Sequence, residues 1–154
     1  MASNPSVRMA DRALRLPPVA APVAAYVPAL RTGQQVRTSG QLPFVDGTLP
    51  ATGKVGAEID PADAYAYARQ AGLNALAAAA SVAGGIDNIT SILHVTVFVA
   101  SAPDFVGQPQ VANGVSDLLA EIFSEAGVHT RSAVAVAVLP LDSPVEVELL
   151  CLVS

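Results

Sequence analysis

Apolar and polar residues alternate most regularly near the end of the chain. Residues 133–138 alternate Ala and Val, which predicts a strand over 132–139 with one residue type dominating each face. Pro140 and the turn that follows it end this stretch, and a second strand is predicted over 145–153. Because side chains on a strand repeat every two residues, Glu146 and Glu148 share one face of the second strand.

Three more strands are predicted upstream. Residues 26–30 and 35–42 flank a turn at 31–34, which predicts a β-hairpin. The stretch 89–100 is apolar at odd and even positions, which is typical of a strand buried on both faces. One predicted face carries Leu93, Val95, Val97 and Val99, and the other carries Ile92, His94, Thr96, Phe98 and Ala100.

Two long helices are predicted between these strands. The first begins at Asp60-Pro61, a capping residue followed by proline in the first turn, and ends near Ala83 before two glycines. Its small-residue stripe lets it lie close to a sheet. The second runs from about Pro109 to Ala126. A short helix is also predicted after Asn4-Pro5.

The order of these elements predicts an α+β fold with a single mixed sheet and two long helices packed on one face. The other face of the sheet is still apolar, so we expect a partner subunit to cover it. We divide the chain into residues 1–25, an N-terminal helix with an extended linker, and residues 26–154, the folded domain.

Composition and charge restrict the functional class. Only 14% of the 154 residues are charged, which is low for a small monomer and again favours subunit contacts. The net charge of −5 argues against a nucleic-acid partner, because nucleic-acid binders need clustered cations. Two distant His and one Cys do not form a metal-ligand pattern, and we expect no metal and no cofactor.

The cellular location is predicted from features that the sequence lacks. Its single cysteine excludes an intrachain disulfide and fits a reducing compartment. The N-terminal stretch has charged residues where a signal peptide would be apolar, and no apolar run is long enough for a membrane helix. We therefore expect a cytoplasmic protein with no membrane partner.

Arg131 has an unusual position in the sequence. It is the only Lys or Arg from Ala71 to Ser154, a span that contains eight acidic residues. A lone cation at the end of a buried strand needs a partner. That partner is either a carboxylate of the chain, Glu146 or Glu148, or a ligand.

Several motifs, taken in order, resemble the reactive intermediate deaminase superfamily (Rid, YjgF-like) from about Tyr26 to the C-terminus. The extra N-terminal helix and the stretch 127–131 resemble its chorismate-mutase-like endoribonuclease branch. The motifs are Ser39-Gly40-Gln41-Leu42-Pro43, the helix around Asn74, Thr96-Val97-Phe98-Val99, Asn113-Gly114, Arg131-Ser132, Leu139-Pro140 and Val145-Glu146-Val147-Glu148.

The resemblance implies a fold of the bacillary chorismate mutase type, a homotrimer, and an active site in each cleft between subunits. It implies hydrolysis of 2-imino or enamine acids to 2-keto acids and ammonia. Arg131 corresponds to the arginine that binds the substrate carboxylate, and Glu146 to the acid that holds the attacking water. The implied pocket also includes Tyr26, Ser39, Gly40 and Ala133, the last standing where many members have Cys.

Two other functions remain open from the sequence. The missing cysteine at Ala133 favours a trimer that binds small carboxylates, such as 2-keto acids, without turnover. Endoribonuclease activity is the less favoured function, because the second half of the chain has too few cations to bind an RNA backbone.

Overall fold

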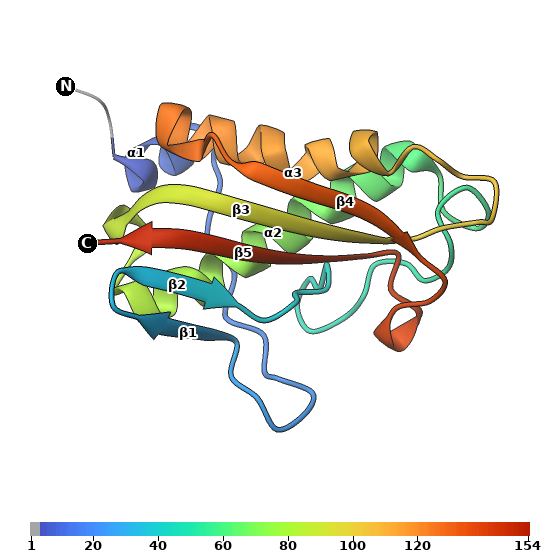
Figure 1. Cartoon of the computed structure of the whole chain (residues 1–154), viewed down its shortest axis with the longest axis horizontal. Helices are drawn as coiled ribbons and strands as arrows, with labels where there is room; N and C mark the ends of the chain where they lie inside the picture. The colour runs from blue at the N-terminus through green and yellow to red at the C-terminus, as the bar shows by residue number, and fades with distance from the viewer. Residues whose placement is uncertain (1–3) are drawn as a thin grey trace.

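Figure 1 shows the computed structural model, which describes residues 4–154. Its elements follow the predicted order of helices and strands. The helices are α1 (Pro5–Asp11), α2 (Pro61–Ala83) and α3 (Gln108–Phe123). The strands are β1 (Ala29–Thr32), β2 (Gln35–Thr38), β3 (Ile89–Ala100), β4 (Thr130–Val136) and β5 (Val145–Val153).

The strands form one mixed sheet in the order β1-β2-β5-β3-β4. Only β3 and β4 run parallel, and the other neighbours are antiparallel. In Figure 1 the sheet lies in front of α2, and α3, which packs against α2, runs along the top of the view above β4. The α+β prediction with one mixed sheet is therefore confirmed, and both long helices cover the same face.

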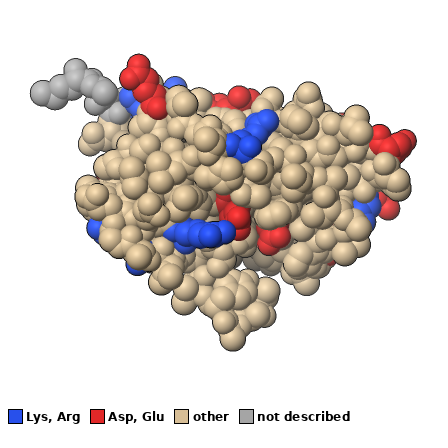
Figure 2. Space-filling model, in the orientation of Figure 1, with Lys and Arg blue, Asp and Glu red and all other residues tan. Residues whose placement is uncertain are grey.

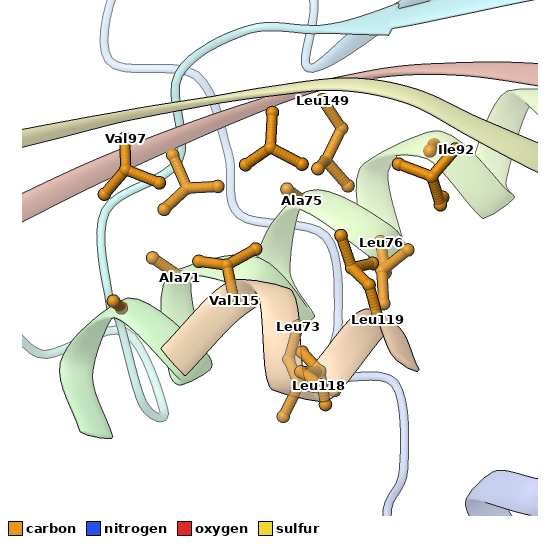
Figure 3. Packing of buried hydrophobic residues seen from close by; sticks show 14 of the residues in the cluster. Ala71, Leu73, Ala75, Leu76, Ile92, Val97, Val115, Leu118, Leu119 and Leu149 are labelled. Carbon is orange, nitrogen blue, oxygen red and sulfur yellow. The ribbon is translucent and has the colours of Figure 1, made fainter. Parts of the chain in front are cut away.

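Small residues allow α2 to lie close to its neighbours (Figure 3). Asp60 caps the helix by accepting a hydrogen bond from the Ala62 N–H at 2.8 Å. Gly114 of α3 lies so close to α2 that a Cβ there would collide with the Tyr65 carbonyl oxygen. Cys151, the chain's one cysteine, is buried in the same core.

The predicted faces of β3 are wrong at one end. The register with β5 shifts between Ile92 and His94, so the alternation of side chains is interrupted there. As a result Ile92 and Val95 both point into the core, with exposed fractions of 1% and 0%, whereas Leu93 is only half-buried. The remaining alternation, with Val95, Val97 and Val99 facing the helices, is as predicted.

Strand β4 also differs from its predicted limits of 132–139. It begins at Thr130, and its parallel pairing with β3 stops at Val136 because β3 ends at the paired residue, Ala100. The chain then turns through a short 3₁₀ segment, Pro140–Asp142.

The sheet face opposite the helices carries few charges (Figure 2). Its charged groups include Arg37 and Glu148, whose side chains approach to 3.7 Å. Beside this face, β4 is an edge strand, and its Val134 side chain is 43% exposed. Long apolar edge strands are normally protected from unwanted pairing. The homotrimer, which would cover this region, stays a prediction.

Helix α1 is fastened to the rest of the fold. The Ser6 N–H and hydroxyl donate hydrogen bonds to the Asp87 carboxylate at 2.8 and 2.6 Å, and Met9 is buried in the core. Within residues 4–154, no helix is both long and apolar enough to cross a membrane.

Candidate functional site

Arg131 lies near the start of β4, and its side chain reaches over α3. One terminal nitrogen, Nη1, donates to Asn113 Oδ1 at 2.8 Å and to Ser116 Oγ at 3.0 Å. The other, Nη2, donates to the Pro109 carbonyl oxygen at 3.3 Å. All three acceptors are neutral, so these bonds orient the guanidinium without cancelling its charge.

The guanidinium keeps hydrogen-bonding capacity for a ligand. Arginine has five N–H groups, and the three bonds above leave the Nε–H and one Nη2–H without a partner in the described chain. A carboxylate bound bidentately uses two such groups. No ion pair of Arg131 occurs among residues 4–154, so neither Glu146 nor Glu148 neutralises it within one chain.

Glu146 lies on β5 in a different surface pocket, of about 60 Å³. The flanking residues Val145 and Val147 point into the core, which places Glu146 on the open face of the sheet. Tyr26 and Gly40 line the same pocket. A Cβ at position 40 would collide with the Glu146 carboxyl group, so a larger residue there would displace that side chain.

The environment of Glu146 raises the pKa of its carboxyl group. Burial raises the pKa of this carboxyl above its usual value, and the nearby charge of Glu148 adds to the effect. Its carboxyl oxygens make no hydrogen bond or ion pair with any residue that the structure describes. A partly buried, unpaired carboxyl group of this kind can hold a water molecule and exchange a proton with it.

Two side chains hold the walls of this pocket in place. The Ser39 hydroxyl donates to the Val27 carbonyl oxygen at 2.6 Å, so Ser39 fixes the segment next to Tyr26 and does not line the pocket itself. Asn74, buried on α2, donates to the carbonyl oxygens of Leu42 and Phe44 at 2.8 and 3.1 Å.

The predicted site residues therefore form two groups within one chain. Tyr26, Gly40 and Glu146 share one pocket, with Ser39 behind it. Arg131 lines a separate hollow of about 320 Å³ beside α3, and Ala133 packs against the core on the same face of β4. A single chain does not bring Arg131 and Glu146 into one cleft.

Sequence reasoning underestimated the residues around Arg131. Asn113 and Ser116 contact Arg131, but the sequence patterns do not predict either as a site residue. They are three positions apart on α3, and such residues share a helix face. This spacing, together with an unpaired arginine on the next strand, was the available signal.

Comparison with known proteins identifies the family. The family model described as "YjgF/chorismate mutase-like, putative endoribonuclease" matches residues 6–153. The chain belongs to this YjgF family. Among curated YjgF relatives, Protein TCP17 of Trypanosoma cruzi is 39% identical over 138 residues, which are 89% of this chain and 86% of that protein. The 2-iminobutanoate/2-iminopropanoate deaminase of Escherichia coli K12 is 35% identical over 130 residues, with 83% and 87% covered.

Solved structures of YjgF proteins share the fold. A crystal structure described as a "putative endoribonuclease" from Shewanella oneidensis MR-1 matches with a TM-score of 0.94 and 35% identity, covering 98% of this chain and 100% of that one. E. coli TdcF with bound serine matches with a TM-score of 0.63 and 30% identity, covering 90% and 94%. The predicted resemblance to the Rid/YjgF superfamily is thus confirmed.

Proposed function

We propose that this protein is a hydrolytic deaminase that converts 2-imino or enamine acids to 2-keto acids and ammonia. The observation that carries the proposal is the Arg131 guanidinium, which is oriented by neutral acceptors and has two N–H groups left for a carboxylate. The deaminase name of a relative at 35% identity supports the same reaction class.

The proposed site is composite and lies between subunits of a homotrimer. Arg131 and Glu146 line different pockets of one chain, so they act on one substrate only if Arg131 of one copy faces Glu146 of another. The sparsely charged sheet face and the exposed apolar edge of β4 are surfaces that such an assembly would cover.

The chemistry requires few groups. Arg131 binds the substrate carboxylate and fixes the position of C2. Glu146 holds a water molecule and accepts its proton as the water oxygen bonds to C2 of the protonated imine, while the C=N electron pair moves to nitrogen and leaves an amine. The same carboxyl group then returns that proton to the nitrogen, and the C2–N bond breaks with its electrons on nitrogen. Ammonia leaves as the Glu146 carboxylate takes the proton of the C2 hydroxyl and the ketone forms.

The test is the release of ammonia and pyruvate from freshly generated 2-iminopropanoate, measured as a rate above uncatalysed hydrolysis. We expect acceleration by the wild type and little by Glu146→Gln, which keeps the shape of the side chain but cannot accept a proton. An intact trimer that accelerates the hydrolysis of no 2-imino acid would overturn the proposal.

A second candidate is a trimer that binds small carboxylates without turnover. The neighbour TdcF was crystallised with bound serine, an amino acid rather than an imine, and Ala133 stands where many deaminases have Cys. This candidate predicts thermal stabilisation by 2-keto acids that Arg131→Ala abolishes, together with no acceleration of imine hydrolysis. Equal stabilisation of Arg131→Ala would exclude it.

A further inference from the structure

A row of hydrogen bonds connects Arg131 to the backbone before β4. Arg131 Nη1 donates to Ser116 Oγ at 3.0 Å. Ser116 Oγ lies 3.0 Å from His129 Nε2, and His129 Nδ1 lies 2.6 Å from the Gly127 carbonyl oxygen. Ser116 and His129 are both half-buried, so solvent competes only partly for these bonds.

The carbonyl oxygen of Gly127 sets the direction of the bonds in this row for the tautomer of His129 protonated at Nδ1. A carbonyl oxygen only accepts, so His129 Nδ1 carries the proton that is donated to Gly127. If the Ser116 hydroxyl donates to the imidazole, the tautomer protonated at Nδ1 leaves Nε2 as the acceptor of that proton. The hydroxyl proton therefore points away from Arg131, and a lone pair of Ser116 Oγ faces Nη1.

We propose that Ser116 and His129 are positioning residues for the Arg131 guanidinium. His129 orients the Ser116 hydroxyl, and Ser116 together with Asn113 engages both N–H groups of Nη1. The Nε–H and the second Nη2–H are thereby held for the substrate carboxylate. This inference rests on the proposed carboxylate-binding role of Arg131 and adds the residues that make this role possible.

A serine next to a histidine also has the arrangement of a nucleophile and its base. In this site the Ser116 hydroxyl accepts a hydrogen bond from Arg131 and donates one to His129. Because both sides of the hydroxyl are occupied, this arrangement fits a positioning role better than a nucleophile. The two roles differ in kinetics. Loss of a positioning hydroxyl raises KM or Kd, whereas loss of a nucleophile abolishes kcat.

The test compares Ser116→Ala, Ser116→Thr, His129→Ala and the double variant Ser116→Ala/His129→Ala. The matched control is Ser124→Ala, because Ser124 lines the same hollow but makes no side-chain hydrogen bond in the described chain. Readouts are KM and kcat with 2-iminopropanoate, Kd for pyruvate, the melting temperature, and the Arg131 Nε–H signal in ¹⁵N–¹H NMR spectra. That signal is identified by its absence in Arg131→Lys.

For Ser116→Ala we expect KM and Kd to rise about threefold to tenfold, the effect of one lost hydrogen bond, with kcat nearly unchanged. Ser116→Thr keeps the hydroxyl and should recover most of the binding. His129 acts through Ser116, so the double variant should bind no more weakly than Ser116→Ala alone. The Nε–H signal should shift and broaden in Ser116→Ala and His129→Ala but not in Ser124→Ala.

Three results would overturn the inference. The first is a folded Ser116→Ala variant whose Kd and Nε–H signal are unchanged. The second is additive effects on Kd in the Ser116→Ala/His129→Ala variant. The third is a loss of kcat with unchanged Kd in Ser116→Ala. If wild-type protein neither binds pyruvate nor hydrolyses an imino acid, the proposed function fails, and this inference fails with it. If the wild type does either and Ser116→Ala matches it, only this inference fails.

Discussion

Arg131 and Glu146 lie on opposite faces of one sheet, on strands that β3 separates. Arg131 faces the helix side, where Asn113 and Ser116 accept its hydrogen bonds, and Glu146 faces the open side. Any reaction that needs both groups therefore requires two copies of the chain.

Subunit mixing tests this arrangement. Arg131→Ala and Glu146→Gln trimers should each be inactive, but mixed trimers formed by co-expression should regain activity. If each cleft takes Arg131 from one copy and Glu146 from its neighbour, random mixing restores about a quarter of the clefts. Inactivity of mixed trimers, with mixing confirmed by native mass spectrometry, would place both groups in the site of a single copy or outside the site.

Arg131→Lys should fold and assemble normally but bind 2-keto acids about tenfold to a hundredfold more weakly. Lysine keeps the charge but loses the planar fork, and a charge-assisted hydrogen bond contributes about 1.5–3 kcal/mol. Because Arg131 makes no ion pair within the described chain, the melting temperature should change little. Normal binding together with a depressed melting temperature would instead make Arg131 a structural residue.

Glu146 should make stability depend on pH with a definite sign. Its folded-state pKa is raised, chiefly by burial, so folding favours the protonated form. That stabilising contribution is complete below the unfolded pKa and is lost as pH rises through the folded pKa. Glu146→Gln should therefore melt a few degrees above wild type at pH 7, with the difference disappearing below pH 4.5, the ordinary value for this group.

Differential scanning calorimetry from pH 4 to pH 8 measures this difference. Glu148→Gln is the companion variant, because the Glu148 charge is the smaller cause of the raised pKa and its removal should lower the pKa of Glu146 only slightly. A gain from Glu146→Gln that is equal at all pH values would show that its ionisation is not involved.

Gly40→Ala should displace the Glu146 side chain. The added Cβ has no room beside the carboxyl group in its present position, and because the Glu146 side chain is flexible we expect the low end of the usual overpacking cost, about 1 kcal/mol. We expect a lower melting temperature and a large loss of turnover. The control is Gly40→Ala/Glu146→Ala, in which the shorter side chain relieves the collision and should restore stability but not activity. Failure of the double variant to regain stability would mean that the collision is with something else.

The sequence predicted the fold well where local signals agreed. Asp60-Pro61 and the glycines after Ala83 bound α2 as expected, and β5 has its predicted limits. The faces of β3 could not be predicted throughout, because a bulge depends on pairing with a distant strand and leaves no pattern in a single apolar stretch.

The candidate site was predictable in its charges but not in its geometry. A lone cation and an acid on a strand stood out in composition, and alternation placed Glu146 opposite its apolar neighbours. The partition into two pockets depends on which strands become neighbours. Motif order along the chain does not determine which strands become neighbours. The contacts of Asn113 and Ser116 with Arg131 depend on α3 packing beside β4, which the sequence does not show.

Because Cys151 is buried, the reaction of its thiol with a reagent reports opening of the core. Burial raises the pKa of this thiol to about 11, so almost none of it is thiolate at neutral pH, and reagents cannot reach it in the core. The chain has no other cysteine that could react. The rate at which a maleimide labels the native protein therefore measures how often the core opens, and every variant above can be compared on that scale without adding a probe.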